Sequence, residues 1–264
     1  MTKIEAKVLC DSMSGSHRLT TMQLTYPRFV HAEYMTHRVF SRNAASSRAI
    51  PVAKMMSNII GHPVIPIHWG ANQKGMQAFQ ELSPESQSNC EEIWLDALEK
   101  MLVSVQALMA EGLHKQIANR LLEPWMHITV IHSATDWQNF FKLRCHGMAE
   151  PHMQALAMEM KASYEFSTPV EREWHRPLTG FHGDEELTQA ELRLVSVARC
   201  ARVSYLTHDG VRDVQADLKL AETLRTNGHF SPWEHVAHAA DGRWGNFKGW
   251  KQLRWYVERR KDLP

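Results

Sequence analysis

Apolar and polar residues alternate at the start of the chain, over residues 3–10 and again over 19–26. A period of two is typical of a strand with one buried face. Ser14 and Gly15 lie between the two runs, and small turn residues there favour a tight reversal of the chain. We therefore expect a β-hairpin, with Pro27 ending its second strand.

Helical spacing dominates the middle of the chain. Over residues 90–113 apolar residues recur every three or four positions, which predicts one long amphipathic helix. Residues 29–40 also show a helical pattern, and the small polar run 41–51 that follows is expected to be a loop. Further helices are expected at about 113–122, 136–146, 149–163, 191–203 and 214–227.

The periodic spacing of apolar residues is interrupted over one long stretch of the chain. Residues 164–186 are rich in proline, glycine and charge, which indicates a linker. Near the end of the chain, residues 227–239 read as a turn that leads into a strand. The pattern predicts an α+β fold, a small and mostly antiparallel sheet flanked by long helices. We expect a single domain over 1–264, composed of a first part (1–163), a linker (164–190) and a last part (191–264).

Charge and composition narrow the classes of partner. Thirty Lys and Arg balance 29 Asp and Glu, so no global field favours nucleic acid or an anionic membrane. A phosphate ligand would need a local arginine cluster.

No apolar run approaches the ~20 residues that span a bilayer, and the N-terminus lacks a signal-peptide pattern, so we expect a cytoplasmic protein. The four cysteines are far apart and are expected to be reduced thiols.

The densest polar cluster is the run 36–48, which holds three Arg, one His, three Ser and one Asn but no acid. Planar guanidinium groups pair with phosphate oxygens, and hydroxyls suit sugar or ring atoms. A solvated, charged helix end is the alternative. Because no carboxylate neutralises the cluster, we favour an anion site of nucleotide type. Sixteen histidines and nine tryptophans further suggest a polar, aromatic-lined pocket.

Two other stretches carry candidate chemistry. In residues 136–146, Asn139 and Arg144 could line opposite sides of a pocket rim, although a surface amide and a surface arginine are the alternative. In residues 227–235, glycine, proline and aromatic residues form a turn that presents His229 and Glu234. Cys145 follows an arginine, but no catalytic motif surrounds it.

A metal site is the alternative interpretation of the histidines near the C-terminus. His229, His235 and His238 are spaced by six and three residues, which matches no common zinc pattern, and no cysteine pair assists. We therefore expect no metal.

Together the three stretches resemble the flavin-dependent thymidylate synthases. Residues 116–124 are similar to that family's E-x-A-R-x-x-L-P element, residues 139–152 to its helix leading into A-Q-x-E, and 228–235 to its G-H-x-(S/T)-P-F-E-H motif. The family signature R-H-R-x-x-S-x-N-E-x-S-x-R-Y is matched at His37, Arg38, Ser41, Asn43, Ser46 and Arg48.

The order of these motifs differs from that of the family. There the G-H-x-(S/T)-P-F-E-H segment precedes the arginine-rich signature, whereas here it lies near the C-terminus. We interpret the chain as a circularly permuted, phage-type member whose old ends are joined by residues 164–190. Such rearrangements are tolerated where chain ends lie at the surface.

The resemblance implies reductive methylation of dUMP at C5, giving thymidylate without a cysteine nucleophile. Methylenetetrahydrofolate would donate the carbon, FAD would carry the hydride and NADPH would be the reductant. It also implies a homotetramer in the cytosol of a bacterium or a phage-infected host, acting on a small nucleotide and neither nucleic acid nor membrane. By motif match, Arg144 is the catalytic residue that polarises the ring, His37, Arg38, Ser41, Asn43, Asn139 and His229 bind FAD, and Ser46, Arg48 and Arg120 bind dUMP.

Departures from the family pattern leave alternatives open. Glu33 and Glu150 stand where the family usually has glutamine, and Ala44 replaces the signature glutamate. Near the C-terminus, Gln252 and Arg254 resemble a second copy of the segment before the signature, so we expect Glu33, Glu150 and Gln252 among the substrate-binding residues. The alternatives are 5-hydroxymethylation of a pyrimidine deoxynucleotide, and a catalytically inactive protein that binds nucleotide or flavin.

Overall fold

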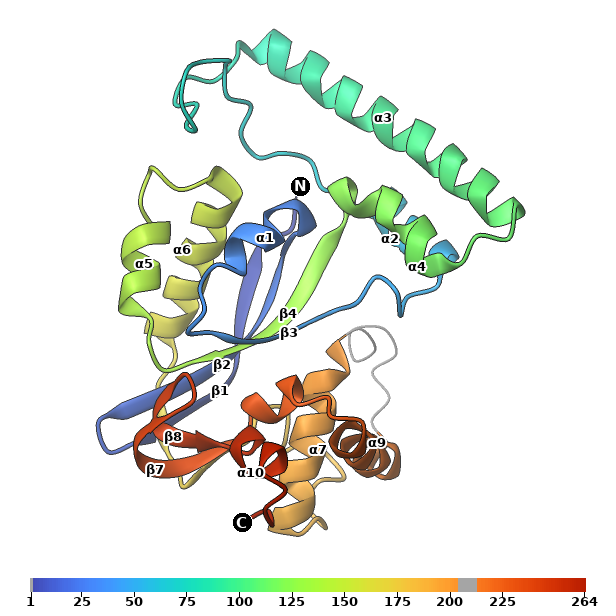
Figure 1. Ribbon diagram of the computed structural model, residues 1–264. Helices are drawn as coiled ribbons and strands as arrows, with labels where there is room; N and C mark the ends of the chain where they lie inside the picture. The colour runs from blue at the N-terminus through green and yellow to red at the C-terminus, as the bar shows by residue number, and fades with distance from the viewer. Residues whose placement is uncertain (1, 204–212) are drawn as a thin grey trace.

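The computed structural model describes residues 2–203 and 213–264 (Figure 1). Its chain opens with the expected hairpin, in which β1 (Glu5–Ser14) pairs antiparallel with β2 (His17–Pro27). Gly15 takes a positive φ of 55° at the turn, a conformation that glycine adopts at little cost. The period of two therefore predicted this part of the fold correctly.

The hairpin belongs to a five-stranded sheet with the order β3-β4-β2-β1-β5. The other strands are β3 (Ser41–Ala44), β4 (His127–Ala134) and β5 (Val170–Glu171), and only the pairing of β1 with β5 is parallel. The loop expected over 41–51 was therefore wrong at its start. The short strand β3 exists because it pairs with β4, and a partner so distant in sequence leaves no local signal.

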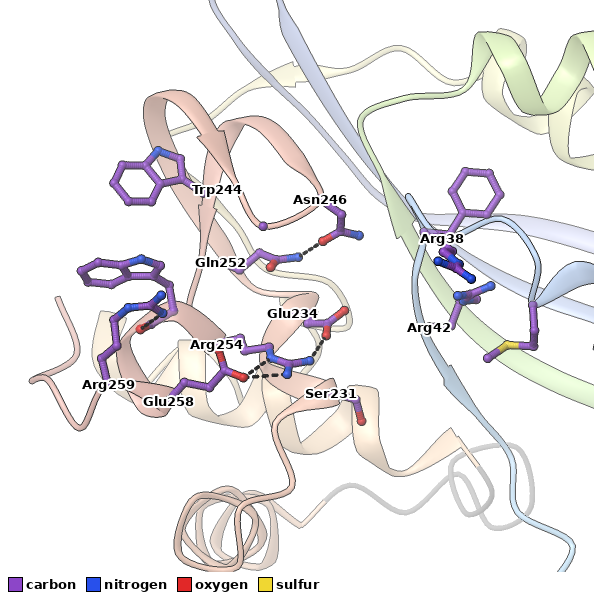
Figure 2. A pocket seen from close by; sticks show the side chains of 14 residues that line it. Arg38, Arg42, Ser231, Glu234, Trp244, Asn246, Gln252, Arg254, Glu258 and Arg259 are labelled. Atoms are coloured by element: carbon purple, nitrogen blue, oxygen red, sulfur yellow. Dashed lines mark hydrogen bonds and ion pairs between the residues drawn. The ribbon is translucent and has the colours of Figure 1, made fainter.

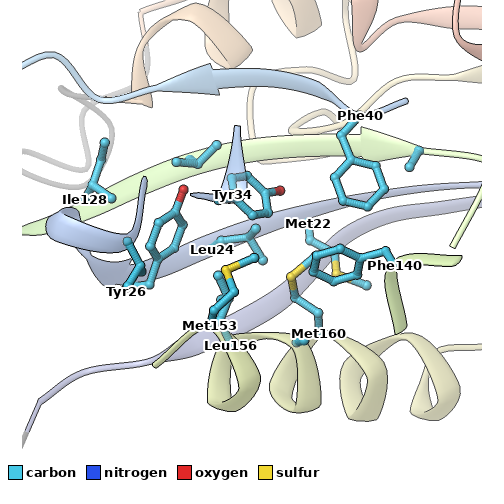
Figure 3. Packing of buried hydrophobic residues seen from close by; sticks show 14 of the residues in the cluster. Met22, Leu24, Tyr26, Tyr34, Phe40, Ile128, Phe140, Met153, Leu156 and Met160 are labelled. Atoms are coloured by element: carbon cyan, nitrogen blue, oxygen red, sulfur yellow. The ribbon is translucent and has the colours of Figure 1, made fainter. Parts of the chain in front are cut away.

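One face of this sheet packs against two helices, α5 (Gln138–Arg144) and α6 (Pro151–Phe166). Helix α6 begins where the Glu150 side chain accepts a hydrogen bond from the Met153 backbone N–H at 2.8 Å. The buried side chains between sheet and helices are shown in Figure 3 and include Met22, Leu24, Tyr26, Tyr34, Phe40, Phe140, Leu156 and Met160.

The helix expected over 29–40 is much shorter than the pattern indicated. A 3-10 turn η1 (Arg28–Val30) leads into α1 (His31–Tyr34), and turns follow up to β3. Tyr34 and Phe40 are both buried in the same core, with ring centroids 6.1 Å apart. The turns after Tyr34 let the chain place both rings in this core before it enters β3.

A second helical layer lies beyond one end of the sheet (Figure 1). It contains α2 (Val52–Gly61), α4 (Lys115–Ala118), the 3-10 helix η2 (Asn119–Trp125) and the long helix α3 (Pro84–Ala110). The predicted long helix is thus confirmed, and Ser83 caps its first turn. A separate cluster of apolar side chains, among them Leu98 and Val105, holds these helices together.

The last part of the chain forms a smaller unit beside the sheet. Its three strands run in the order β6 (Trp174–His175), β7 (Ala237–Trp244) and β8 (Phe247–Gln252). Its helices are α7 (Gln189–Ala201), α9 (Val214–Thr226), the 3-10 turn η3 (Ser231–Glu234) and α10 (Arg254–Glu258). Residues 164–190, expected to be a linker, also contribute the short strands β5 and β6.

A buried chain of polar side chains joins this unit to the sheet. His175 hydrogen-bonds to Thr21 at 2.7 Å through Nε2 and to Ser12 at 2.8 Å through Nδ1. The Nδ1 atom of His235 hydrogen-bonds to Ser133 at 2.8 Å. Burial lowers the pKa of both histidines to about 3, so both rings are neutral. These contacts fix the C-terminal unit against the strands and bring its turn η3 beside β3.

Within the described ranges, no helix has the length and apolar character needed to span a membrane.

Candidate active site

A cavity of about 520 Å³ lies between the start of β3 and the C-terminal unit (Figure 2). We call its two sides the signature wall, which carries Arg38 and Arg42, and the C-terminal wall. Segments almost two hundred residues apart in sequence therefore line one space. The C-terminal wall consists of Ser231, Glu234, Trp244, Gly245, Asn246, Gln252, Arg254, Trp255, Glu258 and Arg259.

The signature wall carries positive charge that no acid in the described part of the chain neutralises. Arg38 is exposed and makes no hydrogen bond or ion pair with any residue that the structure describes. Arg42 donates through Nη1 to the Tyr34 carbonyl at 3.1 Å, which leaves most of its donors free. Two guanidinium groups on one wall, with unused donors, suit an anionic ligand such as a phosphate.

The C-terminal wall balances its main charge internally. Arg254 forms an ion pair with Glu234 through Nη1 and another with Glu258 through Nη2 at 2.6 Å. The bond to Glu258 is the largest of the effects that raise the pKa of Arg254. Because this arginine is already held by two carboxylates, an incoming anion is expected to prefer the opposite wall.

Aromatic rings form the outer rim of the C-terminal wall. Trp244 and Trp255 meet edge to face with centroids 5.6 Å apart, and the ammonium group of Lys251 lies 4.0 Å and 3.7 Å from their ring centroids. The guanidinium of Arg259 lies 4.8 Å from the Trp255 centroid. Flat apolar surface beside cationic groups is suited to a planar, negatively charged ligand.

The two walls are joined by a small hydrogen-bond network. Ser41 is fully buried, and its hydroxyl oxygen accepts from Asn246 Nδ2 at 3.0 Å and from Gln252 Nε2 at 3.1 Å. Asn246 Nδ2 also donates to the Val39 carbonyl at 2.9 Å. Ser41, expected to bind FAD, thus uses its hydroxyl inside the protein and holds the walls together.

Alternate residues of the signature face two different cavities. Arg38 and Arg42 line the first, whereas His37 and Val39 line a second cavity of about 910 Å³ together with Asn139. The segment 37–39 therefore separates the two cavities as a partition that both share. Asn139, expected near the flavin ring, lies on the other side of this partition from Arg38.

Arg144 acts on His37 and lines neither cavity. Its Nε donates to His37 Nε2 at 2.9 Å, so the neutral ring of His37 must carry its proton on Nδ1. Burial first, then the charges of Arg144 and Arg42, lower the pKa of His37 to about 4. The catalytic role of Arg144 stays a prediction, and the structure gives it a contact to the signature instead of to the first cavity.

Several other predicted residues lie outside the lining of both cavities. Asn43 donates to the Cys200 carbonyl at 3.3 Å. Arg120 is exposed and paired with Glu123 at 2.8 Å. Glu150 caps α6, and its bonds from His152 and from the Met153 backbone outweigh burial to lower its pKa. Glu33, Ser46, Arg48 and His229 are exposed. The binding roles of these residues stay predictions.

The three histidines of the metal alternative share no common point. His235 bonds Ser133, His238 bonds the Tyr256 hydroxyl at 2.9 Å, and His229 is exposed. Over residues 2–203 and 213–264, no group of three or more His, Cys, Asp or Glu residues is placed to hold a metal ion.

Sequence reasoning missed several residues of the first cavity, including Arg42, Trp244, Asn246 and Trp255. Arg42 occupies a position that the family signature leaves undefined, although it belongs to the same acid-free cluster. The tryptophans are noticeable only as a compositional excess. What the sequence did not reveal is therefore that the segment 243–255 lies beside the signature and lines the same cavity.

The family model described as thymidylate synthase complementing protein matches residues 16–170 of the chain. This stretch contains the signature wall and ends before the C-terminal wall. Among curated proteins, no significant match was found.

Solved structures give a second comparison. The crystal structure of the UMP/dUMP methylase PolB from Streptomyces cacaoi bound with 5-Br UMP is similar with a TM-score of 0.50 and 16% identity, covering 62% of this chain and 89% of that one. The structure of PolB from the same organism bound with 5-Br dUMP gives a TM-score of 0.48 and 14% identity, over 62% and 90% of the chains. The first of these likenesses shows that the folds are related.

Proposed function

Because the chain belongs to the thymidylate synthase complementing protein family, we propose that it transfers a one-carbon unit to C5 of dUMP. The family match covers the stretch that carries Arg38 and Arg42. The related fold of the UMP/dUMP methylase PolB supports a pyrimidine nucleotide as substrate.

One observation carries this proposal most strongly. Arg38 and Arg42 face the cavity without an acid partner among the described residues, opposite a wall on which Arg254 is already paired with Glu234 and Glu258. A nucleotide monophosphate would supply the missing negative charge, and its ring would lie towards the aromatic rim. The phosphate would be held at about the strength of charged hydrogen bonds, each ~1.5–3 kcal/mol.

The residues present also fit a flavin. We infer that FAD, when bound, supplies the hydride, with methylenetetrahydrofolate as carbon donor and NADPH as reductant. With the phosphate of dUMP at Arg38 and Arg42, the flavin would be held from the second cavity, which offers His37 and Asn139 on the far side of the partition. Arg144 would keep His37 neutral and correctly oriented by donating to its Nε2.

A cysteine nucleophile is not part of the proposal. Burial is the first cause that raises the pKa values of Cys10, Cys145 and Cys200, which disfavours the reactive thiolate. The ring would instead be activated by positioned charged groups. Ser46, Arg48 and Arg120, all exposed, remain proposed dUMP contacts, within a homotetramer in which neighbouring copies could complete their surroundings.

The permuted order of motifs is likewise our proposal. The turn that carries Ser231 and Glu234 lies against the signature wall although it is near the C-terminus. This is the placement expected if residues 191–264 correspond to the segment that precedes the signature in other family members.

The test is incubation of the purified protein with labelled dUMP, methylenetetrahydrofolate, FAD and NADPH, followed by mass spectrometry of the nucleotide. We expect thymidylate from the natural chain and at least a tenfold loss with Arg38→Gln. A 5-hydroxymethyl product would support the hydroxymethylation alternative. Bound nucleotide with no product would support the inactive binding protein, and absence of nucleotide binding would contradict the proposal.

A further inference from the structure

The amide of Gln252 is held in one orientation by a chain of hydrogen bonds. The chain begins at the Val39 carbonyl, which can only accept, so the Asn246 group 2.9 Å away must be the Nδ2 donor. The other end of that amide, Asn246 Oδ1, is therefore an acceptor. It lies 2.9 Å from the Gln252 side chain, which must present its Nε2 donor there.

Both hydrogens of Gln252 Nε2 are used in this arrangement. One is donated to Asn246 Oδ1 and the other to Ser41 Oγ at 3.1 Å. Rotation of the amide by half a turn would set Gln252 Oε1 against Asn246 Oδ1, two acceptors, and lose that bond, while the Ser41 hydroxyl could donate to either end of the amide. Such a reversal is therefore unfavourable, because it leaves two buried acceptors facing each other without a donor.

The remaining atom of this amide, Oε1, accepts no hydrogen bond from the described part of the chain. Gln252 lines the first cavity although only 5% of its surface is exposed. Oε1 lies against Gly245, where a Cβ atom would come within 2.8 Å of this oxygen and displace the amide. Gly245 also has a positive φ of 67°, so glycine suits the position for two reasons.

We propose that Gln252 Oε1 is a specificity-determining acceptor that receives the N3–H of an imide ring. An imide edge presents one N–H donor between two carbonyl oxygens, and it occurs both in uracil and in the flavin ring. The proposal rests on the proposed function of the same cavity. Arg38 and Arg42 are donors only, and they suit the carbonyl or phosphate oxygens of such a ligand.

A fixed acceptor distinguishes uracil from cytosine. Cytosine has a lone pair at N3 and an amino group at C4 in place of the carbonyl. Its N3 would meet Gln252 Oε1 as acceptor against acceptor, and neither group would be satisfied. A freely rotating glutamine would not make this distinction, because it could present its amino group instead. Asn246 is therefore the residue that turns an adaptable side chain into a selective one.

The first experiment varies the ligand and keeps the natural protein. Calorimetric titration would compare dUMP with N3-methyl-dUMP and with dCMP, and FMN with N3-methyl-FMN. We expect a loss of about tenfold or more for N3-methylation in one of the two ring systems. Loss in the dUMP pair alone would assign the acceptor to the substrate, and loss in the FMN pair alone would assign it to the flavin.

The second experiment varies the protein. Gln252→Met removes the amide with little change of volume, so the penalty for N3-methylation should largely disappear. Asn246→Ala frees the amide to rotate, so the preference for dUMP over dCMP should fall by about tenfold, with dCMP gaining relative to dUMP. Gln106→Met, at an exposed position of α3, is the matched control and should change neither ratio.

These outcomes separate the inference from the proposed function. If dUMP binds and is methylated but N3-methylation costs less than about twofold in both ring systems, the role of Gln252 is refuted and the function stands. Equal losses for dUMP and dCMP in Asn246→Ala would also refute it, because they indicate a purely structural role. If Gln252→Met does not fold, the N3-methyl ligands and Asn246→Ala still decide. Failure of both rings to bind would overturn the function and the inference together.

Discussion

Two arginine clusters in this protein differ in how their charge is balanced. Arg199 is 1% exposed, and it pairs with Asp184 at 2.7 Å and with Asp217 at 3.0 Å. Arg38 and Arg42 face a cavity and have no acid partner in the ranges that the structure describes. The same side chain thus serves two purposes in this protein. Paired arginines connect segments of the fold, and unpaired ones on a cavity wall indicate a site for an anion.

The paired cluster connects three segments of the C-terminal unit. Asp184 lies in the irregular stretch before α7, Arg199 lies on α7 itself, and Asp217 lies on α9. Asp184 also accepts from the Gly180 and Phe181 backbone N–H groups. The three charges thus hold α7, α9 and the preceding loop together, and the unit then presents its turn to the signature wall.

The largest effect is expected from Arg199→Met. The change removes the ion-pair partner of the buried Asp184 and leaves Asp217 with Arg202 alone, so the free energy of unfolding should fall by about 3–5 kcal/mol. Urea denaturation would measure it. Arg225→Met removes an exposed arginine paired with Glu222 and should cost no more than ~1 kcal/mol. Equal effects of the two changes would remove the contrast between buried and exposed pairs.

The next effect is expected from Arg38→Gln. Loss of a charged donor on the signature wall should weaken dUMP binding by roughly tenfold to a hundredfold, because charged hydrogen bonds contribute ~1.5–3 kcal/mol. The free energy of unfolding should change by less than ~0.5 kcal/mol, since no partner is lost within the described chain. Calorimetric titration and denaturation of the same sample measure both. If Arg38→Gln lowered the free energy of unfolding and left dUMP affinity unchanged, the signature wall would have a structural role instead of a binding role.

A smaller effect is expected from pH through the buried histidines. The pKa values of His175 and His235 are lowered from 6.5 to about 3 in the folded chain, so the unfolded chain binds protons first as the pH falls. Their stabilisation is complete above pH 6.5 and is lost towards pH 3. Lowering the pH from 6.5 to 5.5 should cost about 1 kcal/mol for each histidine.

His175→Gln tests this pH dependence, because glutamine keeps hydrogen-bonding capacity without a charge change in this range. Its unfolding free energy should fall by about 1 kcal/mol less than that of the natural chain between pH 6.5 and 5.5. Denaturation series at several pH values would show the difference. Identical slopes for both proteins would contradict the assignment.

The sequence predicted the locally determined elements of the fold. The hairpin and the long helix α3 follow from residue spacing, because each buries one face along a continuous stretch. Strand β3 was missed because it depends on pairing with β4, ninety positions later in the chain. The helix expected over 29–40 ended early because Tyr34 and Phe40 both enter the core.

The residues of the signature wall were predictable from the sequence, whereas most of those of the C-terminal wall were not. Arg38 follows from a motif with a recognisable charge pattern, and Gln252 from a weaker resemblance. The division of the signature between two cavities was not predictable, since it depends on which side of the chain His37 and Arg38 each face. The fixed orientation of the Gln252 amide required Asn246 and Val39, whose contacts sequence does not record.

A crystal structure of the protein with dUMP would show whether the signature and C-terminal walls enclose the nucleotide. We expect the phosphate within hydrogen-bonding distance of Arg38 or Arg42, and the ring towards Gln252 and the aromatic rim. Density for dUMP at a site that touches neither wall would contradict it.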